Sequence, residues 1–220
     1  MMKKLVIFGN TVVAELAHYY FTRDGDYEVI AFTVDRSYVN NEQFNGIPLI
    51  AFEDLEEKYD KNSFELFLAI GPNKMNSIRE RKFIEAKSKG YSFASYISKN
   101  AIVHSELGEN CLVADGVIIN PFSTIGSNNF FWEQALICNY AEIKDHCYFS
   151  PKITVSSYCM IENNAVIGTN SVVKARVKVA HKSLVGASSY ISKNTKKDGV
   201  YGVRNSEFLG AISGKIDISI

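Results

Sequence analysis

The 220-residue sequence has no excess of either charge, few cysteines and no long apolar run. Lys+Arg and Asp+Glu are both 24, so the formal net charge is zero, whereas a general nucleic-acid-binding protein usually carries a basic excess. No apolar stretch approaches the roughly 18 residues of a membrane span. The amino-terminal sequence MMKKLVIFGN contains an apolar run of only LVIF, which is too short for a signal peptide. We therefore expect a cytoplasmic protein that neither binds nucleic acid nor inserts into a membrane.

The small number of cysteines argues against two kinds of chemistry. Cys111, Cys138, Cys147 and Cys159 form no CxxC pair, and a zinc site would need tighter clustering. In a cytosolic protein these residues should be reduced thiols rather than disulfides. We therefore predict no metal site.

The first part of the chain alternates apolar strands with helices. The predicted strands are 4–8, 27–35 and 64–71, a short extended piece is 44–50, and the predicted helices are 12–21, 52–59 and 73–89. Strands separated by helices indicate a parallel, Rossmann-like sheet. Ligands of such sheets bind at the carboxyl ends of the strands, which here lie near Gly9, Asp35 and Gly71.

From residue 101 the sequence follows a period of six. Fifteen successive leading positions are all Ile, Val, Leu or Phe, without a break in phase: Leu107, Val113, Ile119, Ile125, Phe131, Ile137, Ile143, Phe149, Val155, Ile161, Ile167, Val173, Val179, Val185 and Ile191. If apolar residues fill roughly half of all positions, this arises by chance about once in 30,000. Neither a helix nor a simple strand has this period, whereas a hexapeptide-repeat β-helix does. Three hexads make a coil, so we predict about five coils.

The fifth position of each hexad supports the same fold. Most residues there are small, as tight corners of a narrow prism require, and three of the four cysteines occupy this position. Those thiols are therefore interpreted as small buried side chains. A solenoid needs a cap at each end. The predicted organisation is an α/β domain over 1–97, a parallel β-helix over 98–195 and a capping tail over 196–220.

The two halves together resemble bacterial nucleotide-sugar acyltransferases of the left-handed β-helix superfamily. That group includes bacillosamine and perosamine N-acetyltransferases and proteins labelled sialic-acid O-acetyltransferases. The resemblance is carried by VIFGNTVVAELA, AFTVD, AIGPNKMNSIRERK and LVGASSYISKN, and it covers almost the whole chain. It implies a left-handed β-helix, a homotrimer with acyl-CoA (acetyl-CoA or a longer homologue) between neighbouring subunits, and a role in surface polysaccharide or O-antigen biosynthesis, as part of lipopolysaccharide.

The resemblance assigns the amino-terminal domain to a nucleotide-linked sugar. The positions that match its substrate site are Gly9, Asn10, Thr11, Asp35, Gly71 and Asn73. The first three would lie at a helix N-terminus, where backbone N–H groups suit phosphate, and Asp35 would reach the ribose or base. The family's first loop usually carries more glycines, so a strand-to-helix turn without a ligand is the alternative.

The pantetheine arm of the acyl-CoA would run along the coils. The positions that match its groove are Tyr148, Ser157, Gly168 and Ala187. Several of these residues are equally well explained as turn residues of the repeat.

The expected catalytic histidine is where the sequence departs from the family. That histidine, a general base, is replaced by Asn139, and the next position, often acidic or a second histidine, is Tyr140. Asn cannot act as a base, and an unperturbed Tyr has a pKa near 10. Asp145 and His146 follow shortly, but in the hexad pattern His146 projects from an adjacent face. We interpret His146 as a solvated turn residue, with a role as a relocated base as the alternative.

Three functions fit these residues. An amine that is neutral when bound can attack a thioester without a protein base and lose its proton to water or a nearby carboxylate, while Asn139 orients the amine or holds the oxyanion. This favours an N-acyltransferase acting on a nucleotide-linked amino sugar. Alternatively, Asp145 or His146 serves as the base through a local rearrangement, and a sugar O-acetyltransferase, which acts on a hydroxyl, is the second candidate among enzymes. In the third interpretation the site is degenerate, and a trimer binds a sugar nucleotide without turning it over.

Overall fold

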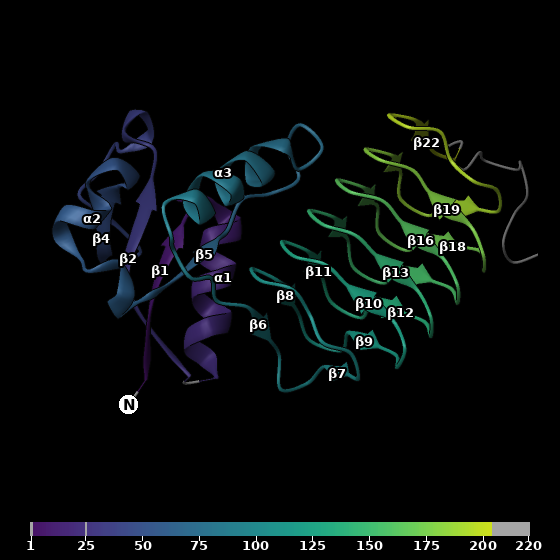
Figure 1. The fold of residues 1–220 in the computed structure, drawn as a ribbon, viewed down its shortest axis with the longest axis horizontal. Coiled ribbons are helices and arrows are strands. Elements are labelled where there is room, and N and C mark those ends of the chain that lie inside the picture. Colours follow the sequence, from purple (N-terminus) through teal and green to yellow (C-terminus); the bar gives the residue numbers. More distant parts are fainter. Residues whose placement is uncertain (1, 25, 204–220) are drawn as a thin grey trace, which may run out of the picture.

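The computed structural model describes residues 2–24 and 26–203, which form an α/β domain and a β-helix packed side by side (Figure 1). The α/β domain has a sheet of order β3-β4-β2-β1-β5. Its strands are β1 (Lys3–Phe8), β2 (Tyr27–Val34), β3 (Gln43–Phe44), β4 (Ile47–Ala51) and β5 (Glu65–Leu68). Neighbouring strands pair in parallel, except that β3 and β4 form an antiparallel hairpin. The predicted parallel sheet is confirmed, with the extended piece at 44–50 folded into that hairpin.

All three predicted helices differ in extent from the expectation, the first only by two more residues at its end. The α-helices are α1 (Val12–Arg23), α2 (Leu55–Lys58) and α3 (Ser77–Ser88). The helix predicted from residue 73 begins only at Ser77, because Lys74, Met75 and Asn76 all have positive φ angles, of 51°, 53° and 59°. The helix predicted over 52–59 begins as a 3₁₀ turn, Phe52–Asp54, before α2.

The second part is a three-sided β-helix built from two-residue parallel strands. In the described residues one side is the seven-stranded sheet of β6 (Tyr96–Ile97), β8 (Leu112–Val113), β11 (Phe130–Phe131), β14 (Tyr148–Phe149), β17 (Val166–Ile167), β20 (Leu184–Val185) and β22 (Val200–Tyr201). The second side is the six-stranded sheet of β7 (Ile102–Val103), β9 (Ile118–Ile119), β12 (Leu136–Ile137), β15 (Thr154–Val155), β18 (Val172–Val173) and β21 (Tyr190–Ile191). The third is the four-stranded sheet of β10 (Thr124–Ile125), β13 (Glu142–Ile143), β16 (Met160–Ile161) and β19 (Lys178–Val179).

The period of six places the core of the β-helix as predicted. Fourteen of the fifteen leading residues are buried in one apolar cluster, and the remaining one, Leu107, packs against it half-buried. Cys111, Cys147 and Cys159 are buried, and burial raises the pKa of each thiol. Of the expected carboxyl-terminal cap, Val200–Tyr201 pairs with β20, and 204–220 lies outside the described residues.

Each coil turns at three corners, and the corners stack into three edges. At most corners one position has a positive φ angle. Edge A joins the four-stranded to the seven-stranded side, edge B joins the seven-stranded to the six-stranded side, and edge C joins the six-stranded to the four-stranded side. The positive-φ residues that recur every 18 residues are Asn110, Asn128, His146, Asn164 and Lys182 on edge A, Gly116, Gln134, Lys152, Asn170 and Ser188 on edge B, and Phe122, Tyr140, Tyr158 and Arg176 on edge C.

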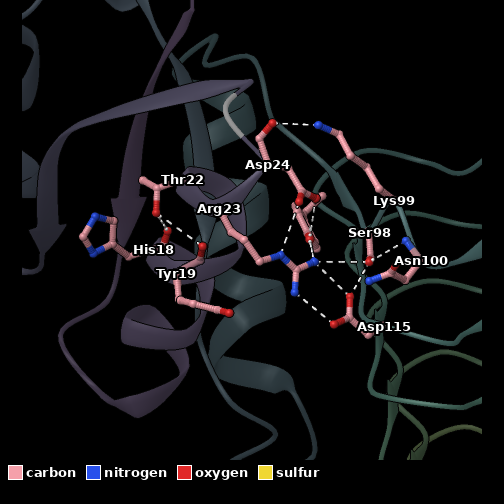
Figure 2. Close-up of polar contacts among 10 residues, drawn as sticks. His18, Tyr19, Thr22, Arg23, Asp24, Ser98, Lys99, Asn100 and Asp115 are labelled. Atoms are coloured by element: carbon pink, nitrogen blue, oxygen red, sulfur yellow. Dashed lines mark hydrogen bonds and ion pairs between the residues drawn. The ribbon is translucent and has the colours of Figure 1, made fainter.

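The α/β domain covers the seven-stranded side and edge A. The rings of Phe67 and Phe130 stack across this junction, with centroids 5.6 Å apart. Next to edge B, Arg23 of α1 donates to both carboxylate oxygens of Asp115 at 2.9 Å and to the hydroxyl of Ser98 at 3.3 Å (Figure 2). Edge C, opposite the seven-stranded side, therefore lies on the far side of the β-helix from the α/β domain (Figure 1).

The edge A junction is built around one buried arginine of α3. Arg79 is fully buried, and its guanidinium donates to the carbonyls of Ile70, Asn128, His146 and Cys147 at 2.9 to 3.3 Å. It also lies over the Phe130 ring, 4.3 Å from the centroid. Burial lowers the pKa of Arg79 to about 10, so the group stays charged at neutral pH.

In the described residues, no helix has the length and apolarity needed to cross a membrane.

Candidate functional site

A cleft of about 400 Å³ opens at the carboxyl ends of β1, β2 and β5. The six residues that the resemblance assigned to the sugar nucleotide all line it: Gly9, Asn10, Thr11, Asp35, Gly71 and Asn73. They come from three loops far apart in the sequence, and the parallel sheet brings those loops to one edge.

The β1–α1 loop places a helix N-terminus at this cleft. Gly9 has a φ angle of 140°, and a Cβ atom there would lie 2.8 Å from the Ala69 carbonyl oxygen, so this position requires glycine. Thr11 is the N-cap residue of α1, and its side chain makes no capping hydrogen bond. The first-turn N–H groups of a helix lack intrahelical acceptors and carry partial positive charge, which suits an anionic group in the cleft.

Asp35 is held in place by a buried lysine of α3. The Lys82 ammonium lies 2.5 Å from Asp35 and 2.6 Å from Glu85, and it is enclosed by the rings of Phe8 and Phe52. Lys82 is only 5% exposed. The carboxylate is therefore fixed at the rim of the cleft, where it can accept a hydrogen bond from a ligand hydroxyl or base N–H.

Nine further residues line the cleft and were missed from the sequence. Four are apolar residues at or near strand ends, and the other five are Tyr38, Lys74, Ser77, Ile78 and Arg81. Lys74 and Arg81 are exposed and take part in no ion pair within the described residues. Their charges are available to an anionic ligand in the cleft. Four of these five residues lie within the motif AIGPNKMNSIRERK quoted above. The sequence did not reveal that they face the cleft, because no glycine marks the left-handed turn that directs them there.

The predicted catalytic residues divide between two edges. Asn139 and Tyr140 lie on edge C. The Asn139 side chain is half-buried and donates to the Pro121 carbonyl at 3.4 Å, whereas Tyr140 is exposed. Asp145 and His146 lie on edge A, so the structure does not bring the four residues together.

The interpretation of His146 as a solvated turn residue is wrong. Its side chain is buried against α3, with the Phe83 ring edge-on at 5.7 Å and Asn128 Nδ2 2.8 Å from its Nδ1. Burial lowers the pKa of His146. Asp145 accepts a hydrogen bond from the Ser127 backbone N–H at 2.7 Å. Both residues therefore stabilise the turn and the domain junction, at a different edge from Asn139.

The four residues matched to the acyl-CoA groove do not share one surface of the chain. Tyr148 points from the seven-stranded side toward the α/β domain, Ser157 lies on edge C, and Gly168 and Ala187 lie on edge B. A Cβ atom at Gly168 would lie 2.6 Å from the Ala187 nitrogen, so coil stacking alone accounts for this glycine. Within the described residues, no group of three or more His, Cys, Asp and Glu is arranged to hold a metal ion.

Several solved structures share this fold. The acetyltransferase domain of PglB from Neisseria gonorrhoeae FA1090 matches with a TM-score of 0.82 at 20% identity, covering 91% of this chain and 97% of that one. A histidine-to-asparagine mutant of perosamine N-acetyltransferase from Caulobacter crescentus, in complex with CoA and GDP-perosamine, matches with a TM-score of 0.82 at 21% identity, covering 92% and 95%. WeeI from Acinetobacter baumannii AYE matches with a TM-score of 0.73 at 18% identity, covering 92% and 95%.

No protein-family model and no curated protein matches the sequence. The structural likenesses extend over nine-tenths of the chain and include both of its parts. They confirm the predicted fold, an α/β domain with a parallel sheet followed by a left-handed parallel β-helix.

Proposed function

We propose that this protein is an acyl-CoA-dependent N-acyltransferase that acts on a nucleotide-linked amino sugar. The observation that carries the proposal is the cleft, in which a helix N-terminus, two exposed cations and a fixed carboxylate converge. Phosphates suit the first two and a ribose or base suits the third. Two of the structural neighbours are described as acetyltransferases, and one of them is in complex with CoA and GDP-perosamine.

The proposed reaction needs no strong base. The amine nitrogen of the sugar attacks the thioester carbonyl, a C–N bond forms, the C–S bond breaks, and the amine proton passes through water to the departing CoA thiolate. Asn139 is suited to donate its amide N–H to the oxyanion that develops on the carbonyl. The histidine-to-asparagine mutant noted above is in complex with both CoA and a sugar nucleotide, so asparagine in place of a histidine in that enzyme is compatible with binding of both.

A second copy of the chain is needed to complete this site. The cleft belongs to the domain that covers the seven-stranded side, whereas Asn139 lies on edge C, on the far side of the same β-helix (Figure 1). The six-stranded side presents an outward column of mostly apolar residues that no described segment covers: Ile102, Ile118, Leu136, Thr154, Val172 and Tyr190. We propose that this side packs against a neighbour in a homotrimer, which would bring Asn139 of one copy toward the cleft of the next.

We place the reaction in the cytoplasm, where acyl-CoA is available, as a step in surface polysaccharide or O-antigen synthesis. An O-acetyltransferase is the second candidate within enzymes, but a hydroxyl acceptor generally needs the base that edge C lacks. A trimer that binds sugar nucleotides without turnover is the third.

Mass spectrometry of products tests the proposal. The protein is incubated with acetyl-CoA and longer acyl-CoAs and a panel of UDP-, GDP- and dTDP-linked amino sugars, with the matching hydroxy sugars in parallel. We expect one amino sugar to gain an acyl group, and Asn139→Ala to lower kcat roughly 10²-fold to 10³-fold, as loss of an oxyanion donor does. His146→Asn should retain the activity.

Other outcomes identify the alternatives. A product on the hydroxy sugar alone would indicate the O-acyltransferase. Loss of product in His146→Asn, with Asn139→Ala active, would show that the base lies at edge A. Tight binding of a sugar nucleotide without any product would leave the degenerate binding protein.

A further inference from the structure

Edge C carries exposed aromatic rings at positions where the backbone favours small or polar residues. Phe122, Tyr140 and Tyr158 have φ angles of 65°, 59° and 60°, a region that is uncommon for residues other than glycine, asparagine and aspartate. The same positions on edges A and B hold Asn, His, Lys, Gln, Ser or Gly. The three rings are 68%, 48% and 50% exposed. Fold stability therefore does not explain them, because burial contributes little and the backbone conformation disfavours them.

The rings form one continuous strip along the axis of the β-helix. Phe122 and Tyr140 stack with centroids 5.1 Å apart and an interplanar angle of 14°, and Tyr140 and Tyr158 stack at 4.9 Å and 3°. The Arg176 guanidinium continues the strip, 4.7 Å from the Tyr158 centroid. Asn139 directly precedes Tyr140, so the candidate oxyanion donor lies beside the middle of the strip.

Charge is distributed unevenly along this edge. The edge C turns 120–123, 138–141, 156–159, 174–177 and 192–195 contain no Asp or Glu. Their cations are Lys174, Arg176 and Lys193, which are all exposed and all lie at the carboxyl-terminal end. Edge C thus runs from a cationic end, past Asn139 and the Phe122 ring, to the first turn, 104–106, where the exposed Glu106 carries the opposite charge.

Because Asn139 places the thioester at edge C in the proposed reaction, we propose that the aromatic strip of this edge selects a transferred acyl group larger than acetyl. The proposal rests on the proposed acyltransferase function and names its donor. CoA carries its phosphates at one end and its thioester at the other, which matches the charge distribution of the edge in one direction only. With the phosphates at Lys174, Arg176 and Lys193 and the thioester carbonyl at Asn139, the acyl chain continues past Tyr140 toward Phe122.

The spacing of the coils sets the size of that group. Adjacent coils are about 4.8 Å apart, so the acyl chain must extend roughly one coil beyond the carbonyl to cover the Phe122 ring. Acetyl is too short for this, whereas butyryl begins to reach the ring and hexanoyl covers it. The reaction is the one given above: the amine forms the C–N bond to the same carbonyl carbon, CoA leaves with the amine proton, and the longer chain is carried over unchanged.

Donor preference measured on matched variants tests this assignment. The quantity is the ratio of kcat/KM for hexanoyl-CoA to that for acetyl-CoA, with butyryl-CoA as an intermediate probe and the amino-sugar nucleotide fixed. The variant is Phe122→Asn, because asparagine tolerates the positive φ angle and occupies it at Asn110 and Asn128. The control is Gln134→Asn, at the same corner position on edge B, which lies outside the proposed track.

We expect the wild-type ratio to be roughly tenfold or more in favour of hexanoyl, since each methylene in an apolar site contributes about that factor. The ratio should fall toward one in Phe122→Asn and stay unchanged in Gln134→Asn. Efficient acetyl transfer with a wild-type ratio at or below one would overturn the donor assignment and leave the acyltransferase function intact. A lower oligomeric mass of Phe122→Asn in solution, with an unchanged donor ratio, would also overturn the donor assignment. The strip would then be a contact between copies of the chain.

If no donor is turned over, the acyltransferase function is contradicted, but the assignment of the aromatic strip is not yet tested. Equilibrium binding then tests the strip by itself. Hexanoyl-CoA should bind wild-type protein roughly tenfold more tightly than CoA does, and Phe122→Asn should remove this difference. Equal affinities of wild-type protein for CoA and hexanoyl-CoA would reject the assignment of the strip.

Discussion

Edges A and C of the β-helix have the same backbone conformation but differ in the side chains at their corners and in what packs against them. On both edges a positive φ angle recurs at 18-residue spacing. On edge A the residues at this position that face the α/β domain are Asn110, Asn128, His146 and Asn164, all buried. On edge C three of the four are aromatic and 48% to 68% exposed.

The difference shows what the repeat encodes and what it leaves free. The hexad fixes the inward residues and the left-handed corner, which both edges obey. The outward side chain of the corner is free to match whatever packs there. Edge A matches α3 with hydrogen-bonding side chains, and edge C, which no described segment covers, presents the aromatic strip. Exchanging features between the two edges therefore tests whether each is adapted to its neighbour.

The largest expected effect comes from two arginines that both stack on aromatic rings. Arg79→Met should lower the free energy of unfolding by about 3–5 kcal/mol, because it removes the guanidinium donor from the buried Asn128 and His146 carbonyls of edge A. Arg176→Met removes an exposed stacking contact and should cost about 0.5–1 kcal/mol. Urea denaturation of both variants measures the difference. Equal losses of unfolding free energy in the two variants would show that the buried hydrogen bonds of Arg79 add no stability beyond its contact with the ring.

A smaller effect is expected when the corner residues of the two edges are interchanged. Asn128→Tyr places a bulky ring at the buried junction and removes the bonds to Asn110 and His146, which should cost about 2–3 kcal/mol. Tyr140→Asn replaces an exposed ring with a residue suited to the positive φ angle, so its stability should stay within about 0.5 kcal/mol of wild type. Thermal unfolding of the pair measures both changes. A strongly destabilised Tyr140→Asn would mean that the strip supports the fold.

Much of the architecture is predictable from this sequence, and for a definite physical reason. The inward positions of the β-helix are constrained only by burial. The leading residues from Leu107 to Ile191 therefore keep a period of six whatever packs against the outside. The parallel sheet is predictable because alternation of strand and helix leaves few other arrangements. The start of α3 was not predictable, because Lys74, Met75 and Asn76 adopt left-handed angles that no glycine marks.

The candidate site divides in the same way. The cleft residues follow from strand ends, which are local features, and the six expected positions meet in one place. The environment of His146 depends on docking of α3, and six-residue spacing says nothing about which edge is covered. The one signal in the sequence is that His146 lies at 18-residue spacing from Asn110, Asn128 and Asn164. All four are buried, and His146 is the ionisable residue among them.

The smallest expected effect concerns the protonation of that row. The Leu68 N–H donates to Asn110 Oδ1 at 2.8 Å, and Asn110 Nδ2 donates to Asn128 Oδ1 at 2.7 Å. This fixes the Asn128 amide so that its Nδ2 donates to His146 Nδ1 at 2.8 Å. Nδ1 of His146 must therefore accept this hydrogen bond and carry no proton in the folded protein. Burial lowers its pKa and Arg79 adds to this, whereas Glu80 and Asp145 act in the opposite direction.

The sign of the pH dependence follows from the direction of that shift. An unfolded histidine has a pKa of about 6.5, so below this pH the unfolded state binds more protons than the folded one. Stability from the neutral ring is complete above pH 6.5 and is lost as the pH falls through this value toward the lowered pKa of the folded state. Between pH 7.5 and 5.5 we expect a decline of about 1 kcal/mol, the net contribution of one hydrogen bond.

His146→Asn isolates this contribution, because asparagine suits the positive φ angle and can accept the bond from Asn128 without titrating. The variant should unfold at the same urea concentration as wild type at pH 7.5 and at a higher one at pH 5.5. His18, whose pKa burial also lowers, is unchanged in both proteins and accounts for the decline that the variant retains. If both proteins lose the same stability between the two pH values, the edge A row does not depend on a neutral His146, and the contrast with edge C is one of packing alone.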